Sequence, residues 1–212
     1  MSVTGWRQLV AGLIGHRYRK ASVADSESLA RLLGEEALWL SQKATIEYLR
    51  LRAGAGWTTL HKDALFTDAL ERCRAEGFTA VLGDVAETAL ALLRHAGVAG
   101  ETARCVVTAA ATEALRAHRA ALGTAAEDAD LEARLARALL AAPRSAHVIA
   151  RTGAARLFRA LPLHTDLGAH DREAVENNVR FGLCAVYGRL ERAIDPQRLV
   201  GPAGFEPATK PL

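Results

Sequence analysis

Residues 26–52, with the sequence SESLARLLGEEALWLSQKATIEYLRLR, give the strongest indication of the fold class. Its apolar residues recur every three or four positions, which is the period of an α-helix. The main apolar stripe is Leu33, Ala37, Leu40, Ala44, Tyr48 and Leu51, and a second face carries Trp39, Ile46 and Leu49. Apolar residues on more than one side predict a central, largely buried helix. Asp25 stands where an N-cap is expected, with Glu27 in the first turn, and glycine follows at position 54.

The helical period continues on both sides of this stretch. It predicts further helices over about residues 5–20, 58–95, 101–122, 124–142, 145–161 and 172–194, and Gly77 or Gly83 can interrupt the second of these. Ala and Leu dominate the apolar residues, aromatic residues are few, and no strand pattern is found. Short connections favour antiparallel neighbours. The sequence therefore predicts an all-α fold, a single-domain helical bundle of about seven helices.

Composition divides the chain into three regions. Residues 1–24 form a basic amphipathic N-terminal helix, residues 25–195 form the bundle, and residues 196–212 form a Pro/Gly-rich tail that contains four of the six prolines. The tail is too rich in proline for a helix and too poor in apolar residues to pack, which predicts disorder.

The positive charge of the chain is concentrated at the N-terminus. The net charge is +3, and residues 1–24 contain Arg7, Arg17, Arg19 and Lys20 but no acidic residue. A nucleic-acid-binding protein usually spreads a basic stripe over its fold, so this pattern does not favour a nucleic-acid partner. The helix can lie on a membrane surface or dock on a protein partner, or it can pack on its own bundle. The predicted interaction surface is Trp6, Arg7, Leu9, Val10, Leu13, Ile14 and Arg17.

Two polar groups are candidates for one ligand-binding pocket. Four charged residues of the central helix share a face at spacings of seven, four and three, and a second group follows Pro162. If they converge, the carboxylates can titrate, the cations can hold an anion and a carboxylate can orient a histidine. The alternatives are inter-helix salt bridges, and a purely capping role for Asp171 at the start of the last helix. The candidate residues are Glu36, Lys43, Glu47, Arg50, His164, Asp166, His170, Asn178 and Arg180.

Several familiar sites are missing from the sequence. There is no Gly-x-Ser-x-Gly motif, no phosphate-binding glycine-rich loop and no Glu-x-x-His pair of the kind used by di-metal bundles. Cys73, Cys105 and Cys184 fit neither a disulfide framework nor a zinc site, and we expect them to be buried, reduced thiols. No apolar run reaches the ~18 residues of a membrane span. We therefore expect a cytoplasmic protein without a metal or a cofactor. Peripheral attachment to the inner membrane is compatible with this expectation.

Short motifs also suggest a family. WLSQKAT at residues 39–45, ERCRAE at 71–76, PLH at 162–164 and NVRF at 178–181 resemble a bacterial all-helical family that is sometimes labelled "esterase". The resemblance covers roughly residues 35–195. It implies an all-helical fold and, through the label, ester hydrolysis.

The leading hypothesis is a helical binding protein for a protein partner, a membrane surface or a lipid-like small molecule, and a homo-oligomer is compatible with it. The first alternative is a small hydrolase that combines the charged face of residues 36–50 with the loop around His164. The second alternative is a DNA-binding regulator. A helix-turn-helix needs a glycine-containing turn near the N-terminus, but Gly34 lies inside a continuous helical pattern.

Overall fold

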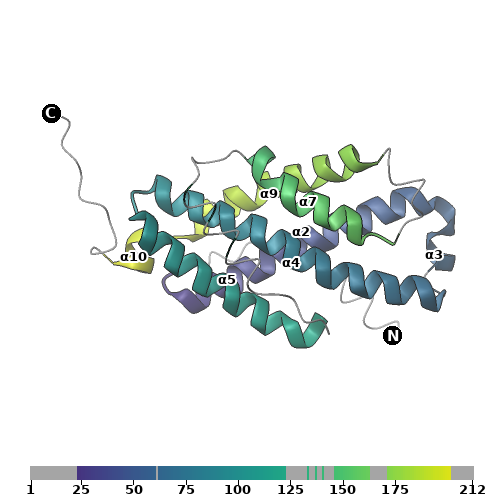
Figure 1. Ribbon diagram of the computed structural model, residues 1–212, viewed down its shortest axis with the longest axis horizontal. Helices are drawn as coiled ribbons and strands as arrows, with labels where there is room; N and C mark the ends of the chain where they lie inside the picture. Colours follow the sequence, from purple (N-terminus) through teal and green to yellow (C-terminus); the bar gives the residue numbers. More distant parts are fainter. Residues whose placement is uncertain are drawn as a thin grey trace.

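The computed structural model describes residues 23–60, 62–122, 146–162 and 171–201, together with residues 133, 137 and 140. These parts of the chain are almost entirely α-helical, as Figure 1 shows. They contain no named strand, only an isolated bridge between Val23 and Ile194. The prediction of an all-α fold is confirmed.

Five long helices make up the described bundle. They are α2 (Ser26–Ala53), α4 (Ala64–His95), α5 (Gly100–Leu122), α7 (Ala146–Ala160) and α9 (Arg172–Ala193). Two short helices accompany them, α3 (Trp57–Leu60) and α10 (Pro196–Val200), and a 3-10 turn spans Gly54–Gly56.

Helix α2 begins and ends where its sequence predicts. The Asp25 carboxylate accepts a hydrogen bond from the Ser28 amide at 2.7 Å, and the Ser28 hydroxyl accepts one from the Asp25 amide at 3.2 Å. This reciprocal arrangement satisfies amide groups that have no partner inside the helix. The helix ends at Gly54, whose φ of 50° is a conformation that glycine adopts readily.

The region predicted as one helix from residue 58 begins differently. The chain first forms α3, and a new helix then starts after Asp63, whose carboxylate accepts from the amides of Leu65 and Phe66. Gly77 and Gly83 do not interrupt α4, which continues to His95. A Cβ atom at Gly77 would lie 2.7 Å from Leu157 Cδ1, so this glycine allows α7 to pack closely on α4.

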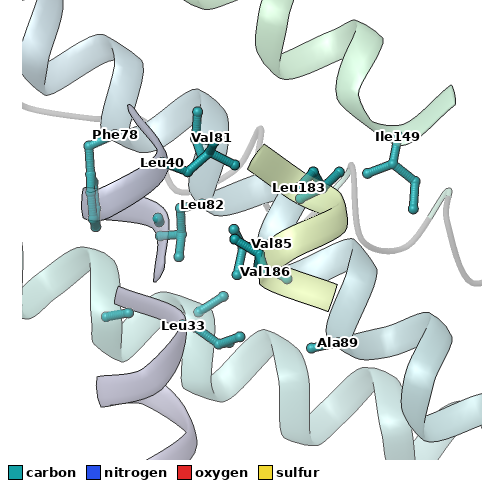
Figure 2. Close-up of a cluster of buried hydrophobic side chains, with 14 of the residues drawn as sticks. Leu33, Leu40, Phe78, Val81, Leu82, Val85, Ala89, Ile149, Leu183 and Val186 are labelled. Carbon is teal, nitrogen blue, oxygen red and sulfur yellow. The ribbon is translucent and has the colours of Figure 1, made fainter. Parts of the chain in front are cut away.

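Helix α4 lies at the centre of the core. It packs against α2, α5, α7 and α9, and Figure 2 shows its side chains in the middle of the apolar cluster. The labelled residues of α4 are Phe78, Val81, Leu82, Val85 and Ala89, and each is at most 1% exposed. Leu33 and Leu40 of α2, Ile149 of α7, and Leu183 and Val186 of α9 surround them.

Two sequence predictions about the ends of helices are wrong. Leu51, which was assigned to the main apolar stripe of α2, is 76% exposed, so the buried part of this stripe ends at Tyr48. Pro196 does not begin a disordered tail, because the chain forms α10 over Pro196–Val200. Asp195 caps this helix, and a proline fits its first turn. Residues 202–212 lie outside the described part of the chain.

Candidate functional site

Helices α2 and α9 lie antiparallel, and polar side chains from both meet along their contact. We call this contact the α2–α9 seam; its polar residues are Glu36, Trp39, Lys43, Glu47, Tyr48 and Arg52 of α2, Asn178 and Arg189 of α9, and Asp171, which precedes α9. Gly182 makes the close approach possible, because a Cβ atom there would overlap the Leu40 side chain. The seam therefore combines one tight apolar contact with several polar ones.

One end of the seam is a buried ion pair. Arg189 Nε donates to the two carboxylate oxygens of Glu36 at 2.7 and 2.9 Å, and Arg189 Nη2 donates to Oε2 at 2.5 Å. Glu36 is only 1% exposed. The Arg189 guanidinium also lies 4.1 Å from the centre of the Trp39 ring, a cation–π contact. The candidate carboxylate of Glu36 therefore forms a bidentate ion pair with the planar guanidinium group of Arg189.

The middle of the seam brings three candidate residues together. Lys43 Nζ lies 2.6 Å from Glu47 Oε2, and Asn178 Nδ2 donates to the same oxygen at 3.2 Å. The side chain of Glu47 is 52% exposed, so the pair is screened by water and contributes little to stability. The hydrogen bond from Asn178 to Glu47 can position the Asn178 side chain beside α2.

The other end of the seam is built on Asp171. The sequence predicts this residue as the N-cap of the last helix, but its side chain makes no capping hydrogen bond. The Tyr48 hydroxyl donates to Asp171 Oδ2 at 2.5 Å, and Arg52 donates through Nε and Nη2 to both carboxylate oxygens. Burial, together with the hydrogen bond to Asp171, raises the pKa of Tyr48, and the hydrogen bond to Asp171 raises the pKa of Arg52.

The other candidate residues are not brought into this group. Arg50 is exposed near the end of α2, and the Arg180 guanidinium lies 5.6 Å from the centre of the Phe181 ring. His164, Asp166 and His170 lie outside the described residues. The whole N-terminal interaction surface, from Trp6 to Arg17, does so too. A single pocket that joins both polar groups remains a prediction.

A pair of buried carboxylates in α4 was missed by sequence reasoning. Asp84 is fully buried and Glu87 is 4% exposed, one turn apart in a stretch rich in alanine and leucine. The Thr88 hydroxyl donates to the Asp84 carbonyl oxygen at 2.8 Å. Helix α7 passes this point at Gly153, where a Cβ atom would overlap the Asp84 carboxylate. Acidic residues inside an otherwise apolar stretch were the available signal.

The cysteines differ from the expectation of three buried thiols. Cys73 is buried, and burial raises its pKa to about 12, so its thiol stays protonated at neutral pH. Cys105 and Cys184 are exposed. Within the described ranges, no group of three His, Cys, Asp or Glu side chains could hold a metal ion.

Two exposed leucines lie at the α3 end of the bundle. Leu51 at the end of α2 is 76% exposed, and Leu65 at the start of α4 is 80% exposed. At the same end, the ring of Trp57 in α3 meets that of Phe66, the residue after Leu65, edge to face, with the ring centres 6.3 Å apart. Figure 1 shows α3 joining α2 and α4 at one end of the molecule. We call residues 50–60 and 62–66 the tip surface.

No protein-family model, no curated protein and no solved structure matches this chain. In the part of the chain that the structure describes, no helix is both long enough and apolar enough to cross a bilayer.

Proposed function

We propose that this chain is a binding protein that attaches reversibly to an anionic lipid surface, and that the tip surface makes the contact. The observation that carries the proposal is the exposure of Leu51 and Leu65 at the same end of the bundle. Single exposed apolar residues are ordinary in soluble proteins, but two leucines more than 70% exposed at one end of the bundle, close in sequence to the Trp57–Phe66 pair, favour a contact surface there.

The charge of the tip surface favours an anionic partner. Residues 50–63 contain Arg50, Arg52 and Lys62 against a single acid, Asp63, whose carboxylate caps α4. Arg52 shares its charge with Asp171, so Arg50 and Lys62 supply most of the attraction. Leucine and tryptophan beside basic residues are the combination that binds the interface of an anionic bilayer. The basic residues of segment 1–24 would add to the electrostatic attraction toward an anionic lipid surface.

The expected strength of this contact is modest. Partial insertion of two leucines contributes about 2 kcal/mol, and two basic residues near an anionic surface contribute about 1 kcal/mol each. The total of about 4 kcal/mol corresponds to a millimolar dissociation constant, so the attachment is reversible. A second contact through residues 1–24 would strengthen it.

The test is flotation of the full chain with phosphatidylcholine vesicles, made with and without phosphatidylglycerol. We expect binding only to the vesicles that contain phosphatidylglycerol, and a loss of about thirtyfold in the double variant Leu51→Ser/Leu65→Ser, which corresponds to the 2 kcal/mol of the two leucines. Phe181→Ser is the matched control, because it removes an exposed apolar side chain of α9 and leaves the tip surface unchanged. The proposal fails if the wild-type chain binds both kinds of vesicle equally, or if the tip and control variants behave alike.

The hydrolase alternative rests on the resemblance and on His164, Asp166 and His170. Its test is hydrolysis of short acyl-nitrophenyl esters by the wild-type chain and by the variant His164→Ala/His170→Ala. If the variant keeps the activity of the wild-type chain, His164 and His170 are excluded as catalytic residues. The regulator alternative would require salt-dependent binding to duplex DNA, and negligible affinity would eliminate it.

A further inference from the structure

Arg52 belongs both to the tip surface and to the α2–α9 seam. It lies in the last turn of α2, and its side chain is 39% exposed. The same side chain reaches across the seam, where Nε and Nη2 donate to the two carboxylate oxygens of Asp171. The side chain of Asp171 is only 11% exposed. The pair therefore joins a cation that water can reach to a carboxylate that lies mostly inside the seam.

The Asp171 carboxylate also binds a donor on the buried side of the seam. The hydroxyl of Tyr48, a buried residue, donates to Asp171 Oδ2 at 2.5 Å. This hydrogen bond fixes the carboxylate inside the seam, whereas Arg52 has a long side chain that can turn toward water. Arginine binds phosphate in the same bidentate geometry as it binds carboxylate. A lipid phosphate at the tip surface is therefore a chemically equivalent partner for Arg52.

The second ion pair of the seam differs from this one in exposure. The side chain of Arg189 is 16% exposed and that of its partner Glu36 is 2% exposed. The Arg189 guanidinium is also covered on one side by the Trp39 ring, 4.1 Å from the ring centre. A lipid headgroup cannot replace a carboxylate at that depth without separating the helices. Of these two pairs, only the one that contains Arg52 is placed to exchange its anion with a surface.

We propose that Asp171 is an autoinhibitory partner of the tip surface, which withholds Arg52 from the phosphodiester groups of an anionic lipid surface. This inference rests on the proposed function, because it concerns the affinity of the same lipid contact. While Arg52 is paired with Asp171, its charge is compensated, and Arg50 and Lys62 provide the attraction. Release of Arg52 adds a third cation to the tip surface.

The first test is the variant Asp171→Asn, in flotation of the full chain with vesicles that contain phosphatidylglycerol, at physiological ionic strength. We expect binding about fivefold tighter than that of the wild-type chain, because one more basic residue becomes available to the anionic surface. A purely structural role of Asp171 would instead leave the binding unchanged or weaken it.

Asp25→Asn is the matched control for the change in net charge. Asp25 caps the start of α2, and asparagine caps a helix about as well as aspartate. At 1.5 Å per residue, this site lies about 40 Å from Arg52 along the helix, whereas charges are screened over about 8 Å. We therefore expect Asp25→Asn to bind like the wild-type chain.

The double variant Arg52→Gln/Asp171→Asn tests the inference even if Asp171→Asn alone does not fold. It removes both charges of the pair and leaves neither of them without a partner. Because the pair carries no net charge, the double variant should bind like the wild-type chain. Arg50→Gln, at a neighbouring cation in the last turn of α2, should bind about fivefold more weakly. Circular dichroism checks that each variant keeps its helical content.

The wild-type arm separates the failure of this inference from the failure of the proposed function. A wild-type chain that does not bind these vesicles refutes the proposed function, and the inference with it. If the wild-type chain binds, three results would overturn the inference alone. These are a folded Asp171→Asn variant without tighter binding, an equal gain in Asp25→Asn, and a double variant that binds about fivefold more weakly than the wild-type chain.

Discussion

The two interfaces of α2 are built in opposite ways. Toward α4 and α5, α2 presents buried apolar side chains such as Leu33, which Figure 2 shows in the apolar cluster around α4. Toward α9, it presents Glu36, Glu47 and Tyr48, which meet polar groups of the partner helix. Apolar burial is a non-directional interaction. Hydrogen-bonded ion pairs, by contrast, form only when the two side chains have a particular distance and orientation. We infer that the first interface supplies most of the stability and that the second fixes where α9 sits.

The largest effect should come from the apolar side of this comparison. Phe78 is fully buried, and its ring meets His118 edge to face with the ring centres 4.7 Å apart. Phe78→Ala should lower the free energy of unfolding by about 4 kcal/mol, because the cavity cannot close completely. Denaturant unfolding measures the change. Leu65→Ala, at an exposed leucine of the same helix, should change stability by less than about 0.5 kcal/mol.

A smaller effect should distinguish bridging from capping at Asp171. Asparagine caps helices about as well as aspartate, so Asp171→Asn would be neutral if the side chain only capped α9. Because the carboxylate instead binds Tyr48 and Arg52, we expect a loss of about 2 kcal/mol. Asp25→Asn is the matched control at a true N-cap and should cost under about 0.5 kcal/mol. Equal stabilities of the two variants would show that the bridge contributes nothing.

The sequence predicted local structure well because local signals are short. The N-cap at Asp25, the start of α9 at Arg172 and the end of α4 at His95 all follow from residues within a turn or two of each boundary. The exposure of Leu51 could not be predicted in this way. The helical period places Leu51 in the apolar stripe, but whether another side chain covers it depends on tertiary packing, which the period does not encode.

The candidate site was predicted only in part, for a related reason. Glu36, Lys43 and Glu47 were identified from their common face, and the spacing of Lys43 and Glu47 predicts the pair that they form, but Glu36 was not paired with Arg189. Arg189 is 153 residues from Glu36, and Asp171 is 119 residues from Arg52. Periodicity and capping rules connect residues only about four positions apart, so they carry no information on which distant helix supplies a partner. For the same reason, Asp171 was predicted to cap α9, the helix that directly follows it in the sequence.

The most direct test of the α2–α9 seam is a double-mutant cycle on Glu36 and Arg189, followed by denaturant unfolding. Each single change to alanine leaves a buried charge without its partner, whereas the double variant removes both charges. We predict a coupling free energy of about 2 kcal/mol, with the double variant far less unstable than the sum of the single variants. A coupling near zero would contradict the claim that this ion pair positions α9.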